Sequence, residues 1–140
     1  MPNPIVVSVP ITQAPATLYI TVDTYAAYTQ KATIQPVSGG QPFVAQGSGE
    51  GVRIGFWTYQ VQSTGIYQFN VMTQYNDGSG FKNSAGVSAG SFSTRSLNQT
   101  VVFSEDAVDN DDNDCFITFM WFQSGVAARM AAAPEAEVAS

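Results

Sequence analysis

Residues 65–73 read Gly-Ile-Tyr-Gln-Phe-Asn-Val-Met-Thr, a stretch in which apolar and polar side chains alternate. Tyr67, Phe69 and Val71 fall on one face of this stretch, and glutamine and asparagine side chains fall on the other. A period of two residues is typical of a β-strand that buries one face and exposes the other. The stretch therefore predicts a half-buried strand, and we expect its neighbours along the chain to be strands as well.

Similar short segments recur along the chain, and turn residues such as Ser38-Gly39-Gly40 and Asn76-Asp77-Gly78 separate them. The expected strands besides 65–73 are 5–11, 17–23, 29–37, 41–44, 52–61, 87–93, 99–103 and 115–122. Short strands with regular spacing and no helical period favour an all-β fold. We expect a single antiparallel β-sandwich or jelly-roll-like domain of about nine strands over residues 1–125, followed by an Ala-rich C-terminal tail at 126–140.

The composition narrows the classes of function. The chain is 44% hydrophobic, so it can form a core, and its net charge of −6 includes only five scattered Lys and Arg residues. No basic stripe is present for phosphates, so we expect no nucleic-acid partner. The absence of histidine excludes a Ser-His-Asp triad and the common zinc sites. No window approaches the 18 apolar residues of a membrane span.

The single cysteine and the first residues of the chain indicate where in or outside the cell the protein acts. Cys115 cannot form an internal disulfide, and we expect a small buried hydrophobic side chain there, with a reactive thiol as the alternative. The start Met-Pro-Asn-Pro-Ile-Val-Val has no basic region before its short apolar run, so no Sec signal peptide is expected. The expectation is a cytoplasmic or non-classically exported protein that acts at cell surfaces.

Residues 104–114 read Ser-Glu-Asp-Ala-Val-Asp-Asn-Asp-Asp-Asn-Asp and hold six of the eleven acidic residues of the chain. Two carboxylates about 4 Å apart repel by roughly 1 kcal/mol in water and about 4 kcal/mol at an effective dielectric constant near 20. This acidic segment leads directly into the apolar stretch 115–122. We therefore expect a positive partner to hold the segment against the fold.

Calcium suits the oxygen atoms of this segment, because Ca²⁺ takes six to eight oxygen ligands, preferably carboxylates and amide carbonyls. Asp109, Asp111 and Asn113 alternate along the chain and can converge on one ion. Glu105 can complete the ligand shell from the entry of the segment, and Asp114 can bridge or bind with both oxygens. Two Ca²⁺ ions would set a charge of +4 against −6, whereas Mg²⁺ keeps more of its waters and is less suited.

The expected last strand is apolar on both faces. Cys115, Ile117, Phe119 and Trp121 fall on one face, and Phe116, Met120 and Phe122 fall on the other. A strand of an antiparallel sandwich normally exposes one face to water. We expect a second subunit to cover the outer face, which predicts a homo-oligomer (a dimer or tetramer), and the alternative is burial by the tail of the same chain.

Three further side chains have alternative interpretations. Trp57 and Tyr59 are expected to pack in or beside the core, and the alternative is a platform on which a sugar ring stacks. Asp23 precedes the turn at 25–28 and can face the acidic segment.

The segment 104–114, followed by a strand that ends in Trp121, resembles the calcium-mediated fucose- and mannose-binding lectins of bacteria. The signature of that family reads Ser-Glu-Asp-Gly-Thr-Asp-Asn-Asp-Tyr-Asn-Asp. Eight of eleven positions match, and Ala107, Val108 and Asp112 differ. The resemblance implies a small antiparallel sandwich with two adjacent Ca²⁺ ions that directly bind the vicinal hydroxyls of a fucose- or mannose-type saccharide.

The same resemblance assigns roles to individual residues. The implied metal ligands are Glu105, Asp109, Asp111, Asn113 and Asp114. The carboxylates implied to accept hydrogen bonds from the sugar are Asp106, Asp109, Asp111 and Asp114.

Two departures from the family pattern are visible. An Asn-containing loop after an early strand of the family contributes a ligand and specificity contacts, and the matching place here reads Tyr25-Ala26-Ala27-Tyr28. The carbonyl of Tyr25 can still ligate, but Ala26 and Ala27 remove side-chain contacts, so we expect a different sugar preference or a lower affinity. The family's chain ends in a glycine whose carboxylate completes the neighbour's site, whereas fifteen residues follow Gly125 here.

Other functions for the acidic segment remain open at this point. One is a calcium-stabilised structural or adhesive subunit of a surface or fibre assembly that binds no sugar, and another is a solvated acidic turn without metal. A glycosidase needs one protonated and one ionised carboxyl group about 5 Å apart. Carboxylates on a metal are poor general acids, so no enzymatic activity is expected.

Overall fold

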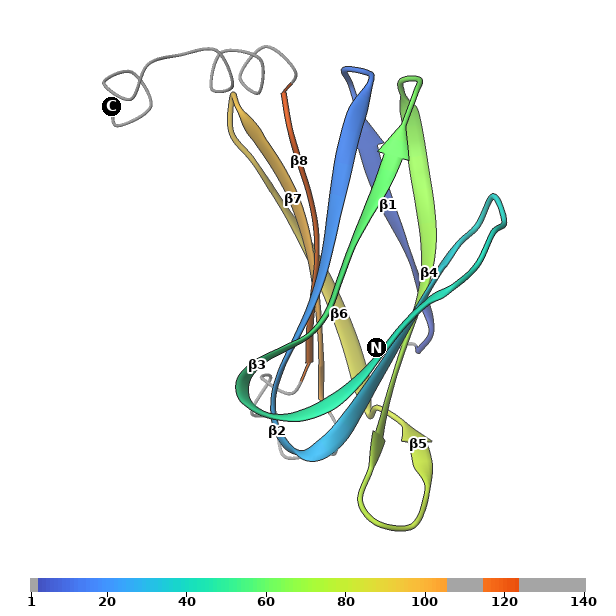
Figure 1. Cartoon of the computed structure of the whole chain (residues 1–140), viewed down its shortest axis with the longest axis vertical. Helices are drawn as coiled ribbons and strands as arrows, with labels where there is room; N and C mark the ends of the chain where they lie inside the picture. Colours follow the sequence, from blue (N-terminus) through green and yellow to red (C-terminus); the bar gives the residue numbers. More distant parts are fainter. Residues whose placement is uncertain (1–2, 106–114, 124–140) are drawn as a thin grey trace, which may run out of the picture.

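The computed structural model describes residues 3–105 and 115–123, and all of its regular secondary structure is β-strand (Figure 1). The strands are β1 (Ile5–Ile11), β2 (Ala16–Pro36), β3 (Phe43–Val61), β4 (Gly65–Asn76), β5 (Phe81–Asn83), β6 (Gly86–Ser93), β7 (Leu97–Glu105) and β8 (Cys115–Phe122). The prediction of an antiparallel all-β fold is confirmed. Within the described ranges, no helix has the length and apolar character that crossing a membrane requires.

Strand β2 joins the two layers of the fold. Its first half pairs with β8 over Tyr19–Thr24, and its second half pairs with β4 over Thr29–Pro36. The antiparallel order is β1-β4-β2-β8-β7-β6, with β3 along the other edge of β2 and β5 beside β4. The bend of β2 and β3 folds this sheet into two facing layers (Figure 1).

The expected strands 17–23 and 29–37 are one continuous strand in the structure. The register between β2 and β3 shifts after Val22, after Thr24 and after Ala26, where the chain bends without ending the strand. Bulges of this kind leave a residue unpaired and increase the local twist, so a strand can turn while its ladder continues. Two such mergers, one in β2 and one in β3, reduce the nine expected strands to seven, and the short strand β5 (Phe81–Asn83), which was not expected, brings the number among the described residues to eight.

Strand β3 also continues through a segment that has the composition of a turn, and the glycines of this segment explain why. Residues 41–44 and 52–61 were expected as separate strands, with glycines between them. Gly49 lies inside β3 with φ +122°, and a Cβ added there would approach the Val52 side chain to 2.7 Å. A glycine within a strand often marks a bulge or a close approach, and here it marks both.

The core lies between the two layers. The rings of Phe69 from β4 and Phe119 from β8 meet with their centroids 5.0 Å apart, and both side chains are fully buried. Burying one such side chain contributes about 1.5–3 kcal/mol. The other fully buried large side chains include Ile11, Leu18, Ile20, Ile34, Ile117 and Trp121.

The last strand, β8, has two distinct faces. Cys115, Ile117, Phe119 and Trp121 point into the core and are 0% exposed, which confirms the expected burial of the cysteine. Phe122 on the opposite face is 36% exposed. Its ring meets Tyr19, which in turn stacks on Phe56, each pair with centroids 6.4 Å apart. These three rings form an aromatic patch on the outside of the sandwich.

Candidate functional site

The acidic segment is attached to the fold at both ends by paired strands. Strand β7 ends at Glu105 and β8 begins at Cys115, and Ser104 pairs directly with Cys115. Directly opposed residues of antiparallel strands lie about 5 Å apart, so the connection at 106–114 must leave and re-enter the sheet at neighbouring points. Five of the six clustered carboxylates are therefore attached between two adjacent strand ends.

The predicted ligands fall almost entirely on this connection. Asp106, Asp109, Asp111, Asn113 and Asp114 lie outside the described residues, so their roles remain predictions. Glu105 is placed as the last residue of β7. Over 3–105 and 115–123, no group of three His, Cys, Asp or Glu side chains could hold a metal ion.

The cations that the structure describes are largely engaged elsewhere. Arg53 donates to both carboxylate oxygens of Asp23, from Nε at 2.9 Å and from Nη2 at 3.2 Å. Lys82 binds Asp77 at 2.9 Å, and Lys31 lies 5.2 Å from the centroid of the Phe81 ring. The whole chain has only five basic residues, so its own side chains cannot neutralise six clustered carboxylates. A bound cation fits this deficit and the all-oxygen donor set.

The ion pair also shows what Asp23 contacts. From the sequence, Asp23 was a residue that could face the acidic segment. Asp23 is committed to Arg53 in a bidentate contact, and this hydrogen bond raises the pKa of the Arg53 guanidinium. Arg53 itself is 57% exposed, so the pair is a surface contact of modest energy. No local sequence pattern predicts this pair, because the partners are thirty residues apart on β2 and β3.

Residues 25–28, which were expected as a turn, continue strand β2 and lie next to the part of it that pairs with the start of β8. Thr24 pairs with Cys115, and the ring of Tyr25 lies 5.4 Å from that of Phe116. Tyr25 is 38% exposed, whereas Ala26 is only 5% exposed and directs its methyl group inward. Tyr25 therefore lies beside the strand that follows the acidic segment. Ala26 can offer a ligand only its main-chain atoms.

The strand pairing of β2 is interrupted in this segment. The ladder between β2 and β3 is interrupted from Ala26 to Gln30, and the ladder between β2 and β4 begins only at Thr29. Ala27 consequently has no register partner among the described strands, and its side chain is exposed. Ala27 is thus an exposed residue at an interruption of both ladders.

Ser104 is a candidate residue that the sequence reasoning did not single out. Its side chain is 1% exposed, and its hydroxyl finds no hydrogen-bond partner within 3–105 and 115–123. A buried hydroxyl normally has a partner, and an unsatisfied one costs about 1–3 kcal/mol. Ser104 is the first residue of the acidic motif, so its position in that motif was the available signal.

Residues 8–123 match the family described as fucose-binding lectin II (PA-IIL). No curated protein matches the chain. Three solved structures share its fold. The high-affinity mannose-binding lectin of Ralstonia solanacearum is 24% identical, with a TM-score of 0.63 over 83% of this chain and 94% of that one.

The second solved structure is the Chromobacterium violaceum lectin CV2L in complex with alpha-methyl-fucoside. It is 23% identical, with a TM-score of 0.60 over 81% of this chain and 94% of that one. The third is the C-terminal domain of the BC2L-C lectin from Burkholderia cenocepacia, which is 17% identical with a TM-score of 0.64. That match covers 86% of this chain and 96% of the domain.

Proposed function

Because the chain belongs to the fucose-binding lectin II (PA-IIL) family, we propose that it is a calcium-dependent lectin for fucose- or mannose-type saccharides. Lectins bind carbohydrates without converting them, so the chain is not an enzyme. The single observation that carries the calcium proposal is the acidic segment between β7 and β8. This segment holds six carboxylates, its two ends join paired strands, and the chain has too few basic residues to neutralise it.

The residues proposed to hold calcium are Glu105, Asp109, Asp111, Asn113 and Asp114. Calcium bound there would supply a site at which sugar hydroxyls replace water as oxygen ligands. Asp106, Asp109, Asp111 and Asp114 are proposed to accept hydrogen bonds from the same hydroxyls. The calcium and the carboxylates together give partners to sugar hydroxyls that an apolar pocket would leave without partners.

We propose two ions per chain, because two divalent cations reduce a local charge of −6 to −2 and one reduces it only to −4. Residues 25–27 of β2, near the start of β8, are proposed to complete the sugar site. Tyr25 offers an exposed ring and its carbonyl, whereas Ala26 and Ala27 offer main-chain atoms. Without polar side chains at these two alanines, sugar selectivity must come mainly from the acidic segment and from Tyr25.

We also propose that the protein is a homo-oligomer that acts at glycan-bearing surfaces. The observation that favours assembly is the aromatic patch of Tyr19, Phe56 and Phe122, where Phe56 is 57% exposed. Exposed aromatic rings in mutual contact are typical of surfaces that a protein partner covers. The patch lies on the outer face of β8 and its neighbours, where a covering subunit was expected.

A second function is a calcium-stabilised structural subunit that binds no sugar. The alanines at 26 and 27 favour it, since they provide no polar side chain to a ligand. A glycan array with and without calcium, run beside a thermal scan, separates the two functions. Calcium-dependent binding to fucosides or mannosides supports the lectin. Calcium stabilisation with no glycan bound supports the structural subunit, and the absence of both effects contradicts the calcium site.

A further inference from the structure

A hollow lies between β3 and β4 on the open edge of the sandwich. The turn from Val61 to Gly65 carries the chain from one layer to the other, and β3 and β4 form no ladder with each other in the described part of the chain. The resulting cavity has a volume of about 640 Å³. This volume is within the range of small-molecule sites, which is about 300–1,000 Å³.

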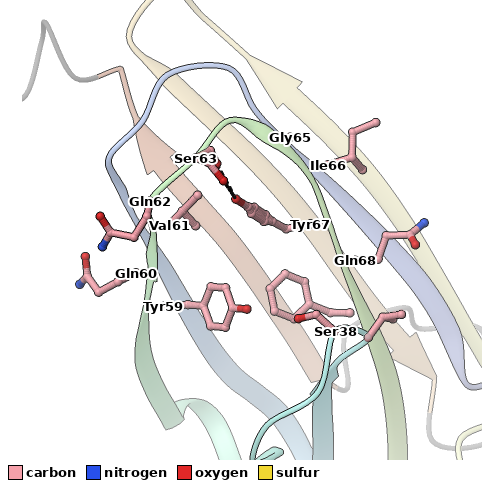
Figure 2. Close-up of a pocket in the computed structure, with 12 residues that line it drawn as sticks. Ser38, Tyr59, Gln60, Val61, Gln62, Ser63, Gly65, Ile66, Tyr67 and Gln68 are labelled. Atoms are coloured by element: carbon pink, nitrogen blue, oxygen red, sulfur yellow. Dashed lines mark hydrogen bonds between the residues drawn. The ribbon is translucent and has the colours of Figure 1, made fainter.

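Aromatic rings form the wall of the hollow. The rings of Tyr59 and Tyr67 project toward each other from the two strands (Figure 2), with their centroids 6.5 Å apart. Tyr59 also meets the buried ring of Phe69 edge-on at 5.5 Å. Tyr59 was expected either to pack beside the core or to offer a stacking platform, and its ring does the first while lining an open cavity.

These rings are fixed before any ligand arrives. The Tyr67 hydroxyl donates to the carbonyl of Ser63 and lies 3.2 Å from the Ser63 hydroxyl (Figure 2). Phe69, against which Tyr59 packs, is 0% exposed and belongs to the core. A site whose walls are already ordered loses less conformational entropy when it binds a ligand.

The polar groups around the rings are all uncharged. Every residue that lines the hollow is neutral, and the polar ones are tyrosine, serine and glutamine, including Ser38, Gln62 and Gln68. The Tyr59 hydroxyl has no hydrogen-bond partner among residues 3–105 and 115–123. A neutral lining offers no charge to an ionic ligand. Tyrosine rings with hydroxyl tips suit a ligand that has one apolar face and a polar edge.

We propose that this hollow is a second, calcium-independent site for a neutral saccharide. A sugar ring presents C–H groups on one face, which stack on an aromatic ring, and hydroxyls at its edge, which bond to tyrosine, serine and amide groups. A purely apolar peptide fits less well, because hydroxyls and amides alternate with the rings. The proposal goes beyond the calcium site and does not depend on it.

The two sites lie at opposite ends of one layer. On β2, Ala16 pairs with Val61 beside the hollow, and Thr24 pairs with Cys115 where the acidic segment re-enters the sheet. Eight residues of extended strand separate these positions, which is roughly 26 Å. One chain would therefore hold two glycans independently and gain avidity on a surface dense in carbohydrate.

The test is an NMR titration of the ¹⁵N-labelled full chain in EGTA, with maltohexaose, cellohexaose and mannohexaose as separate probes. At least one probe is expected to shift amide signals over residues 59–69. Tyr59→Ala should weaken that binding roughly tenfold, because one stacked ring contributes about a tenfold step in affinity. Tyr59→Phe, which removes only the hydroxyl, should weaken it roughly threefold and remains informative where the alanine variant fails to fold.

Tyr28→Ala is the matched control, because Tyr28 is a 43% exposed tyrosine that does not line the hollow. It should leave the titration unchanged. The proposal is overturned by the absence of shifts at 59–69 with all three probes at millimolar concentration, or by binding that folded Tyr59 variants retain in full. An apolar dye that shifts these signals where sugars do not would also overturn it. Calcium-dependent glycan binding reports on the other site, so the two proposals can fail separately.

Discussion

Thr24 of β2 pairs with Cys115 of β8, the first residue after the acidic connection, and Cys115 pairs on its other side with Ser104 of β7. Three strands thus meet where the connection re-enters the sheet. Both ends of the connection are part of hydrogen-bonded ladders, and Cys115 and Ser104 are buried. Neutralising the acidic segment is therefore expected to stabilise the domain as a whole, because both of its ends join paired strands.

Removal of calcium should destabilise the protein. At free calcium a hundredfold above the dissociation constant, each independent site contributes about 2.7 kcal/mol to the free energy of unfolding. Thermal scans in calcium and in EGTA should show a higher melting temperature with calcium, and magnesium at equal concentration should have a smaller effect. Coincident scans in calcium and EGTA would contradict the metal site.

The Asp111→Asn variant should lose most of the calcium response, because it removes the charge of a proposed calcium ligand while keeping nearly the same shape. Asp77→Asn is the matched control, since Asp77 lies in the turn between β4 and β5 and pairs with Lys82. The measurement is the difference in melting temperature with and without calcium. A response that survives in Asp111→Asn, or that Asp77→Asn removes equally, would remove the basis for the ligand assignment.

Acid should protonate the Asp77 carboxylate, in the turn between β4 and β5, over a defined pH range. The hydrogen bond from Lys82, followed by those from Ser79, lowers the pKa of Asp77 from 3.8 to about 2. A lowered pKa means that the ionised form favours the folded state. This contribution is complete above pH 3.8 and is lost as the pH falls toward 2.

An NMR titration of the Asp77 carboxyl carbon should therefore give a midpoint near 2 in the native chain. In Lys82→Met the midpoint should move toward 3.8, because the largest cause of the shift is removed. Arg53→Met serves as the control, since Arg53 pairs with Asp23. An Asp77 midpoint that Lys82→Met leaves unchanged would contradict the assigned cause.

Two isoleucines offer a matched test of the core. Ile117 is 0% exposed between the layers, whereas Ile66 is 70% exposed on β4. Ile117→Val should lower the free energy of unfolding by about 0.5–1.5 kcal/mol, because it deletes a buried methylene group. Ile66→Val should change it by less than about 0.5 kcal/mol. Denaturant unfolding measures both, and equal losses in the two variants would contradict the burial of β8.

Charge in the aromatic patch should disrupt the proposed oligomer. Phe56→Glu places a carboxylate beside Tyr19 at a position that is 57% exposed, so the folded monomer can tolerate it while an apolar interface cannot. Light scattering after size-exclusion chromatography should show a lower mass for this variant. Val44→Glu, at a 48% exposed position of the other end of β3, should keep the native mass. A native protein that is monomeric at all concentrations would contradict the interface.

Sequence periodicity was sufficient to predict the strands that bury one face. The stretch 65–73 lies within β4, because alternation of side chains directly records which face meets the core. The stretch 115–122, which is apolar on both faces, coincides with β8. Periodicity could not show that β2 runs on through residues 24–28. That continuity depends on bulges and on two different partner strands, β8 and β4, which are contacts distant in sequence.

The candidate site was predictable from sequence only in its chemistry. The clustered carboxylates at 105–114 stand out locally, and they indicate calcium whatever the fold. The approach of Tyr25 to Phe116 and the capture of Asp23 by Arg53 depend on strand pairing over long sequence distances. The same holds for the hollow beside Tyr59, which exists because one turn crosses between the layers.

Calorimetric titration of calcium into protein stripped with EGTA tests the central claim most directly. The account predicts saturable binding of two Ca²⁺ ions per chain in the native protein, with binding lost or strongly weakened in Asp111→Asn and retained in Asp77→Asn. The absence of calcium binding to the folded native chain would contradict it.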